Sequence, residues 1–220
     1  MDDNHTSIKS WSELQQRKEV TTEQVVNLYD VWAPTYDETV SKSQSAALAL
    51  SAVLSIVDDE TNRKELNILD IAAGTGRVGQ ELFGNGFRKI DALEPSSEML
   101  KILRNRNVYQ NVYQTFLGGG HKATMIPDNK YDVIVISGGF AKSHLPVDSL
   151  QEVIRMGKKG SIFINRMTAK NIEVDEDLIH LEPFMKKLEE EGFWVQISRT
   201  LDPNVTFSAG PSLTHVYRIT

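Results

Sequence analysis

The sequence predicts an α/β fold with a seven-stranded sheet, made of five parallel strands plus a C-terminal antiparallel hairpin, with helices on both faces and an N-terminal helical lid. From residue 66 onward, short apolar runs alternate with amphipathic runs, which is the pattern of parallel strands joined by crossover helices. The last two apolar runs, FWVQISRT and LTHVYRIT, have no helix between them. We therefore expect these two runs to pair antiparallel at one edge of the sheet.

Length and composition fit one globular domain. The chain has 220 residues, of which 40% are hydrophobic and 25% are charged, values typical of a protein with a sizeable core. We expect residues 1–20 to form a flexible N-terminus and residues 21–220 to form the domain. Within that domain, residues 21–60 are expected to form a helical cap, and residues 66–220 the core.

Charge and residue types disfavour several functional classes. The net charge is −6 and the basic clusters are short, whereas a nucleic-acid binder usually presents a basic stripe, so we expect no nucleic-acid partner. No apolar run approaches the roughly 20 residues that cross a bilayer, and the N-terminus lacks the pattern of a secretory signal. We therefore expect no membrane partner and a cytoplasmic location. The chain has no cysteine, which excludes a disulfide, a thiolate metal site and a cysteine nucleophile.

Two helices are predicted in the cap. The stretch TTEQ has the capping-box pattern, with Thr21 as the N-cap and Gln24 three residues later. Apolar residues follow at near-helical spacing as far as Trp32, and we expect Pro34 to end that helix. A second helix is predicted over residues 43–57.

In the core, predicted strands and helices alternate. The strands are LNILDIA (66–72), KIDALE (89–94), VYQTFL (112–117), YDVIVISGG (131–139), GSIFINR (160–166), FWVQISRT (193–200) and LTHVYRIT (213–220). The helices are VGQELFGN (78–85), SSEMLKILRN (96–105), VDSLQEVIRM (147–156) and LIHLEPFMKKLEEEG (178–192). In such a sheet a ligand binds beyond the carboxyl ends of the strands, where the strand order reverses.

A glycine-rich turn after the first core strand carries the main functional signal. In LDIAAGTGRVG, Gly74, Gly76 and Gly79 fit the G-x-G-x-x-G pattern of dinucleotide-binding turns. Glycines permit positive φ and let a ligand approach the backbone. Glu94, at the end of the next strand, lies 20 residues past Gly74, where an acid can accept hydrogen bonds from both hydroxyls of a ribose. The pattern predicts an adenosine-containing cofactor, with a purely structural turn as the alternative.

The charge of Asp70 helps to distinguish between the possible adenosine-containing cofactors. NAD would place an anionic pyrophosphate over this turn, and a nearby carboxylate would oppose it by an energy on the order of kcal/mol in a partly buried site. S-adenosylmethionine has no phosphate and carries an ammonium and a sulfonium group. Two acids with a glycine turn between them therefore favour S-adenosylmethionine. The alternative is that Asp70 caps the following turn or helix.

These segments resemble the class I S-adenosylmethionine-dependent methyltransferases, which have a Rossmann-like sheet. LDIAAGTGRVG is similar to their first motif, ALEPSSEML to the segment with the ribose-binding acid, and YDVIVISGG to their fourth strand. The terminal hairpin is similar to their usual ending, and the resemblance covers roughly residues 20–220. YDVWAPTYDETV, GGFAKSHLP and KKLEEEGFW resemble, more narrowly, the Williams–Beuren region methyltransferase-like proteins.

The resemblance implies S-adenosylmethionine as the cofactor, S-adenosylhomocysteine as its product, and no metal. The implied residues surround the methionine part, accept hydrogen bonds from the ribose hydroxyls, flank the adenine or cover the cofactor. The implied cofactor-binding residues are Tyr29, Tyr36, Asp70, Ala72, Gly74, Gly76, Glu94, Pro95, Met99, Leu117, Gly118, Ser137 and Gly138. Many relatives have an acid after the third strand, whereas this chain has LGGGH, so we expect backbone groups to recognise the adenine.

The methyl-acceptor side has fewer sequence signals. Methyl transfer is an in-line displacement, so the protein mainly orients the nucleophile, and a general base helps only a protonated one. His144, after the fourth strand, is the candidate catalytic base; alternatively, it is bonded within its loop or caps the next helix. Arg166, just past the fifth strand, is expected to hold an acidic substrate group or to form a surface salt bridge. Tyr36 is expected to cover the cofactor, and Trp32 either does the same or packs in the core.

We expect a methyltransferase that acts on an oxygen, nitrogen or sulfur atom of a small molecule. Without cysteine, methylation of cytosine at C5 is disfavoured, and the N/D-P-P-Y/F/W tetrapeptide of base amino methylation is absent. The alternatives are a non-catalytic regulatory protein that binds S-adenosylmethionine or S-adenosylhomocysteine, a protein-side-chain methyltransferase and an NAD-dependent oxidoreductase. The sequence makes no prediction of the oligomeric state.

Overall fold

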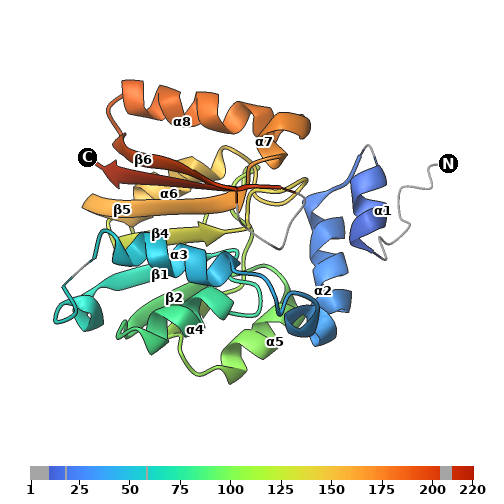
Figure 1. Ribbon diagram of the computed structural model, residues 1–220, viewed down its shortest axis with the longest axis horizontal. Helices are drawn as coiled ribbons and strands as arrows, with labels where there is room; N and C mark the ends of the chain where they lie inside the picture. The colour runs from blue at the N-terminus through green and yellow to red at the C-terminus, as the bar shows by residue number, and fades with distance from the viewer. Residues whose placement is uncertain (1–9, 18, 58, 204–209) are drawn as a thin grey trace.

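The computed structural model describes residues 10–17, 19–57, 59–203 and 210–220. At its centre is a seven-stranded sheet with the order β3-β2-β1-β4-β5-β7-β6 (Figure 1). The chain passes outward from β1 through β2 to β3, returns to β4 beside β1, and then continues outward on the other side. The strand order therefore reverses between β1 and β4, where ligands bind in open sheets of this kind.

The first five strands pair in parallel, as the sequence predicts. They are β1 (Asn67–Ile71), β2 (Lys89–Leu93), β3 (Asn111–Tyr113), β4 (Tyr131–Ser137) and β5 (Gly157–Thr168). The C-terminal strand β7 (Ser212–Ile219) runs antiparallel to β5 on one side and to β6 (Trp194–Asp202) on the other. The expected terminal hairpin is thus confirmed, and its second strand, β7, lies inside the sheet while β6 forms the edge.

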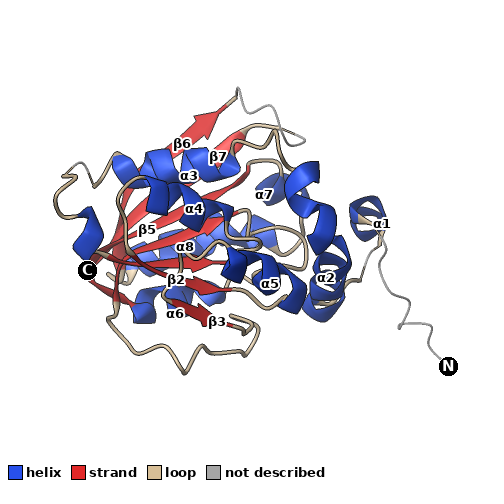
Figure 2. Ribbon diagram, turned by 90° about the horizontal axis from the view of Figure 1, so that it is seen from below, coloured by secondary structure: helices blue, strands red, loops and turns tan. Residues whose placement is uncertain are grey.

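Helices cover both faces of the sheet (Figure 2). One face carries α3 (Ser45–Leu54), α4 (Arg77–Gly84) and α5 (Ser97–Asn105), and the other α6 (Ser149–Met156), α7 (Asn171–Val174) and α8 (Leu181–Glu190). Two 3₁₀ turns, Arg63–Glu65 and Leu178–His180, precede β1 and α8. None of the helices in the described ranges is both long and apolar enough to cross a bilayer.

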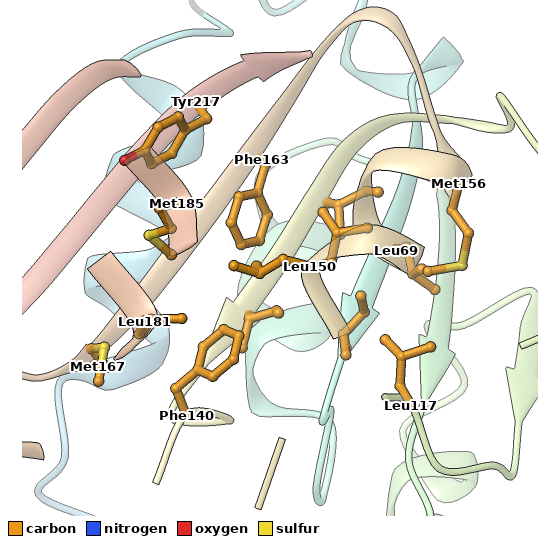
Figure 3. Close-up of a cluster of buried hydrophobic side chains, with 14 of the residues drawn as sticks. Leu69, Leu117, Phe140, Leu150, Met156, Phe163, Met167, Leu181, Met185 and Tyr217 are labelled. Atoms are coloured by element: carbon orange, nitrogen blue, oxygen red, sulfur yellow. The ribbon is translucent and has the colours of Figure 1, made fainter. Parts of the chain in front are cut away.

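Alternating side chains of the central strands build a core on each face. On β4, Val133 and Val135 pack with α3 and α4, whereas Ile134 and Ile136 pack with α6 and α8. Figure 3 shows the second of these cores, where Phe163 lies between the sheet and the helices. Because both faces are covered, the parallel strands read as continuous apolar runs, which is why the sequence identifies them clearly.

Two helices stand beyond the carboxyl ends of the parallel strands (Figure 1). α1 (Trp11–Gln16) lies within the stretch expected to be flexible, which is a difference from that expectation, while residues 1–9 and 18 lie outside the described residues. α2 (Thr22–Thr39) begins with the predicted capping box, in which Thr21 and Gln24 exchange side-chain-to-backbone hydrogen bonds.

The prediction that Pro34 ends this helix is wrong, because α2 continues through Pro34 to Thr39. A proline removes one backbone hydrogen bond and crowds the carbonyl four residues earlier, and tertiary contacts can offset that cost. Here the helix is bonded to the core on both sides of the proline, through Asp30 to Ser96 and through Asp37 to Thr75. The later turns of α2 are therefore held in place by the core.

The ends of two strands also differ from the prediction, because a strand extends only as far as a neighbouring strand pairs with it. The strand expected over residues 112–117 ends at Tyr113, since its neighbour β2 ends at Leu93. Residues 115–117 line a cavity instead of extending the sheet. Conversely, β5 extends to Thr168 because β7 pairs with it along that length, as far as Ser212.

Candidate functional site

A cavity of about 260 Å³ lies under α2 at the carboxyl ends of the strands. Its walls are the turns after β1 and β2, the segment after β3, the ends of β4 and β5, and one face of α2. The singled-out residues that line it are Tyr29, Tyr36, Ala72, Gly74, Glu94, Pro95, Met99, Leu117, Ser137, Gly138, His144 and Arg166. Asp70, Gly76 and Gly118 are not among the lining residues.

The turn after β1 presents backbone to the cavity. Ala72 and Gly74 have φ of 54° and 55°, and Gly76, the N-cap of α4, has φ of 85°. No heavy atom lies within 4 Å of where a Cβ on Gly74 would stand, and the same is true of Gly138 after β4. Because both glycines line the cavity, a side chain at either would enter space that is now open to a ligand.

Glu94 presents a fixed, buried carboxylate. Its Oε2 accepts from the Gly74 N–H at 2.9 Å, and its Oε1 accepts from the Ser96 N–H at 2.9 Å. The residue is 7% exposed, and burial raises its pKa to about 7. Each carboxylate oxygen has two lone pairs, so each retains capacity for one more donor. This arrangement is suited to accept hydrogen bonds from the two hydroxyls of a ribose.

Asp70 is bonded within the protein rather than exposed to the cavity. The Tyr109 O–H donates to Asp70 Oδ2 at 2.8 Å, and the Tyr109 oxygen accepts from the Gly79 N–H at 3.1 Å. A Cβ on Gly79 would stand 2.2 Å from the Tyr109 ring, so this glycine makes room for the tyrosine. Burial raises the pKa of Asp70 to about 7. Asp70 thus supports the first turn of α4 through Tyr109, while the N-cap of that helix is Gly76.

Two tyrosines of α2 face the cavity, and a tryptophan packs beside them. Tyr29 and Tyr36 line the cavity, whereas Trp32 does not. The Trp32 ring stacks on Tyr29 with a centroid distance of 5.9 Å and lies edge-on to Tyr36 at 4.9 Å. Trp32 therefore packs against the two tyrosines without lining the cavity.

Two acids of α2, which sequence reasoning missed, attach this helix to the start of α5 and to the turn after β1. Asp30 accepts from Ser96 Oγ at 2.6 Å and from the Glu98 N–H at 3.0 Å, at the N-terminus of α5. Asp37 accepts from Thr75 Oγ1 at 2.6 Å and pairs with Arg106. In the sequence, each of these residues is only an acid within a predicted helix. Their partners lie more than thirty residues away along the chain, so no local pattern identifies the contacts.

Tyr29 and His144 form a hydrogen-bonded pair in the cavity wall. The Tyr29 oxygen lies 2.9 Å from His144 Nε2, and His144 Nδ1 lies 2.7 Å from the Lys142 carbonyl oxygen. Since a carbonyl only accepts, Nδ1 carries the proton. Burial lowers the pKa of His144, so the ring is neutral near pH 7 and its Nε2 accepts from the Tyr29 O–H. His144 is thus both bonded in its loop and exposed to the cavity.

Arg166 is buried in the wall, with 3% of its surface exposed. Its Nε donates to Ser212 Oγ at 2.8 Å, and its Nη1 donates to Ser45 Oγ at 2.6 Å. The alternative of a surface salt bridge is wrong, because the side chain is not at the surface and pairs with no acid of the described residues.

In the segment after β3, some residues line the cavity and others pack against α6. Leu117 lines the cavity together with Thr115 and Phe116. Gly118 lies against α6 and its preceding loop, where a Cβ would stand 2.6 Å from Pro146 Cγ. The glycine is required there by close packing, with φ of 78°.

Residues 68–160 match a family described as a methyltransferase domain. The chain is 27% identical over 175 residues to human methyltransferase-like protein 27, covering 78% of this chain and 68% of the relative. It is 29% identical over 144 residues to the demethylmenaquinone methyltransferase of Renibacterium salmoninarum, covering 63% of this chain and 56% of the relative.

A solved structure from Pyrococcus horikoshii, described as a candidate RNA methyltransferase, shares the fold. It aligns with a TM-score of 0.56 at 14% identity, covering 80% of this chain and 81% of the other. At that identity the likeness concerns the fold alone.

Proposed function

We propose that this chain, which is a class I S-adenosylmethionine-dependent methyltransferase, methylates a small molecule. The observation that carries the proposal is the cavity of about 260 Å³ that α2 covers with Tyr29 and Tyr36. Covered cavities of this kind take small ligands, whereas an RNA chain binds open surfaces rich in basic side chains. The net charge of −6 supports the same class of acceptor, as does a relative named as a demethylmenaquinone methyltransferase.

The residues present fit S-adenosylmethionine. Glu94 would accept the ribose hydroxyls, since both of its oxygens are held in place by backbone N–H groups. The open space beside Gly74 and Gly138 would admit the methionine part. The proposed adenine contacts are Pro95, Met99 and Leu117, which line the cavity near the ends of β2 and β3. Asp70 would act as a positioning residue, through Tyr109 and the first turn of α4.

The chain's own contribution to the reaction is to position the acceptor, exclude water and take up a proton. S-adenosylmethionine, when bound, supplies an electrophilic methyl group on a positively charged sulfur. A protonated acceptor gives its proton to the Tyr29 oxygen while the Tyr29 proton passes to His144 Nε2. His144 then carries the positive charge, and Tyr29 ends the step neutral, as it began. In this proposal His144 is the general base and Tyr29 is the relay.

The class of acceptor can be tested with labelled methyl groups. The full chain is incubated with methyl-labelled S-adenosylmethionine and with the small-molecule, RNA and protein fractions of an extract from its own source. We expect label in small molecules, and much less label at the same low cofactor concentration with the Glu94→Ala variant, which serves as the cofactor-binding control. Label confined to RNA or protein would contradict the proposed acceptor. S-adenosylhomocysteine binding without label in any fraction would indicate a non-catalytic binding protein.

A further inference from the structure

The β5 end of the cavity contains a buried cation with unused bonding capacity. Arg166 lines the cavity and is 3% exposed. Among the residues that the structure describes, its Nη2 has no hydrogen-bond partner, and this nitrogen is itself buried behind the cavity surface. Burial alone lowers the pKa of this guanidinium, with no charged group acting on it. Within the described part of the chain, the cation thus lies in the wall of the cavity without a counter-charge.

The two hydroxyls bonded to Arg166 orient it and leave its charge uncompensated. Ser212 Oγ accepts from Nε, and Ser45 Oγ accepts from Nη1, but both acceptors are neutral. An arginine stays protonated at any ordinary pH, and a buried charge is costly unless it is paired. Buried ion pairs can often be replaced by apolar side chains without loss of stability, and a buried charge without a partner is destabilising. An arginine with no acid beside it among the described residues therefore indicates a functional reason.

The N-terminus of α3 adds positive potential at the same place. α3 has ten residues and no acid in its first turn. Its N-cap residue, Gln44, makes no side-chain cap, while the Ser45 N–H donates to Ser43 Oγ at 3.3 Å. Its first two residues, Ser45 and Ala46, line the cavity. Unsatisfied N–H groups and the helix dipole make such an end favourable for anions. The Ser45 hydroxyl joins this helix end directly to the Arg166 guanidinium.

The other charged residues of the cavity do not neutralise this end. Arg77 is bonded to the carbonyl oxygens of Val40 and Ser43, at 2.8 and 3.1 Å. Glu94 follows β2, which is three strands from β5 in the sheet order, or about 14 Å at ~4.8 Å per strand. The ribose end and the Arg166 end therefore lie on opposite sides of the cavity.

We propose that Arg166 and the N-terminus of α3 bind an anionic group of the methyl acceptor, a carboxylate, phosphate or sulfate. The inference rests on the proposed function and deepens it, because it identifies the acceptor as a small organic anion. The anionic group is the anchor, and the methyl group goes to a different atom of the acceptor. The competing occupant with the same chemistry is the carboxylate of the cofactor itself.

Direct binding tests the anion site independently of turnover. Benzoate, phenyl phosphate and phenyl sulfate, with neutral benzamide as the reference, are titrated into the complex with S-adenosylhomocysteine by calorimetry. We expect at least one anion to bind more tightly than benzamide, and Arg166→Gln to weaken that anion about tenfold or more, as expected for a charge-assisted hydrogen bond. Arg218→Gln, which changes an exposed arginine on β7, should leave the affinity unchanged. If no anion exceeds benzamide, or if Arg166→Gln binds it equally well, the proposal is overturned.

A second measurement separates the acceptor from the cofactor. We expect the affinity of Arg166→Gln for S-adenosylhomocysteine to stay within about twofold of wild type, which also shows that the variant is folded. An equal loss of affinity for S-adenosylhomocysteine and for the phenyl anion would assign Arg166 to the cofactor carboxylate and overturn the proposal. Arg166→Lys keeps the charge and should retain part of the anion binding.

The labelling assay then links the site to the acceptor. The small-molecule extract is divided on an anion exchanger, and we expect the methyl-accepting material in the retained fraction. Acceptor activity only in the unretained fraction would overturn the acceptor class. Anion binding that depends on Arg166, with no methyl transfer to any fraction, would leave the anion site standing and refute the proposed enzymatic function.

Discussion

Burial and hydrogen bonding act in opposite directions on Glu94. Two backbone N–H groups favour its charged form, but burial is stronger and raises its pKa to about 7. The ribose hydroxyls proposed as its ligands donate to the ionised carboxylate. Cofactor binding should therefore require this residue to lose a proton, which couples the affinity to pH in the neutral range.

The affinity for S-adenosylhomocysteine should rise from pH 5.5 to pH 8, by about thirtyfold, as the Glu94 carboxyl ionises around its pKa of about 7. In Glu94→Gln that dependence should disappear, and Glu94→Ala should weaken binding at pH 8 by roughly 1.5–3 kcal/mol through lost charge-assisted hydrogen bonds. Calorimetry at four pH values measures both effects. Glu81→Gln, an exposed acid on α4, is the matched control. An unchanged affinity in Glu94→Ala would contradict the ribose assignment.

His144→Ala should slow methyl transfer about 100-fold or more, while the affinity for S-adenosylhomocysteine changes little, because the base acts on the acceptor. Burial lowers the pKa of His144, so the base is deprotonated at neutral pH and the wild-type rate should fall only at a pH below 6.5. Rate–pH profiles of the two proteins provide the measurement, with His121→Ala in an exposed loop as the control. The cofactor is kept saturating at every pH, so that the Glu94 ionisation does not enter the profile; if the acidic limb then survives in His144→Ala, another group is the base.

Arg166→Met should leave the melting temperature of the ligand-free protein unchanged or raise it, because the substitution removes an unpaired buried charge. A residue retained only for stability would behave in the opposite way, with a clear loss of thermal stability. Thermal unfolding of wild type, Arg166→Met and Arg218→Gln distinguishes these outcomes.

At the scale of elements, α2 determines whether the cavity is covered. Its position depends on Asp30 and Asp37, which bond to the N-terminus of α5 and to Thr75 in the glycine turn. The capping box at Thr21 predicts where the helix begins, because its two hydrogen bonds are local. The end of the helix is decided by distant partners beyond Pro34, and local pattern rules therefore fail there.

Asp37→Ala should weaken binding of S-adenosylhomocysteine several-fold, since it removes the bonds from α2 to Thr75 and Arg106 and leaves Tyr36 less well placed. The core strands are untouched, so the melting temperature should change far less than the affinity. Glu38→Ala, the exposed neighbour on the same helix, is the matched control. Equal affinities in the two variants would show that α2 is held without Asp37.

At the scale of the whole molecule, separate stretches of the chain between Thr22 and Thr168 line the cavity. S-adenosylhomocysteine at 100 times its dissociation constant should stabilise the fold by about 2.7 kcal/mol, which is a rise of about 5–10 °C in melting temperature for a chain of this size. NAD at the same concentration should produce no rise. A shift with NAD and none with S-adenosylhomocysteine would contradict the proposed cofactor.

The sequence by itself determined the order of strands and helices, the terminal hairpin and the glycine turn, because these depend on hydrophobic periodicity and local backbone chemistry. It also placed Glu94 and Gly74 together, since their spacing follows from one βαβ unit. The tertiary structure was needed to show that Asp70 is held by Tyr109, that His144 bonds to Tyr29, and that Arg166 is buried with no acid beside it among the described residues. Those contacts join segments far apart in the chain, and their burial depends on how the layers pack, which no local pattern encodes.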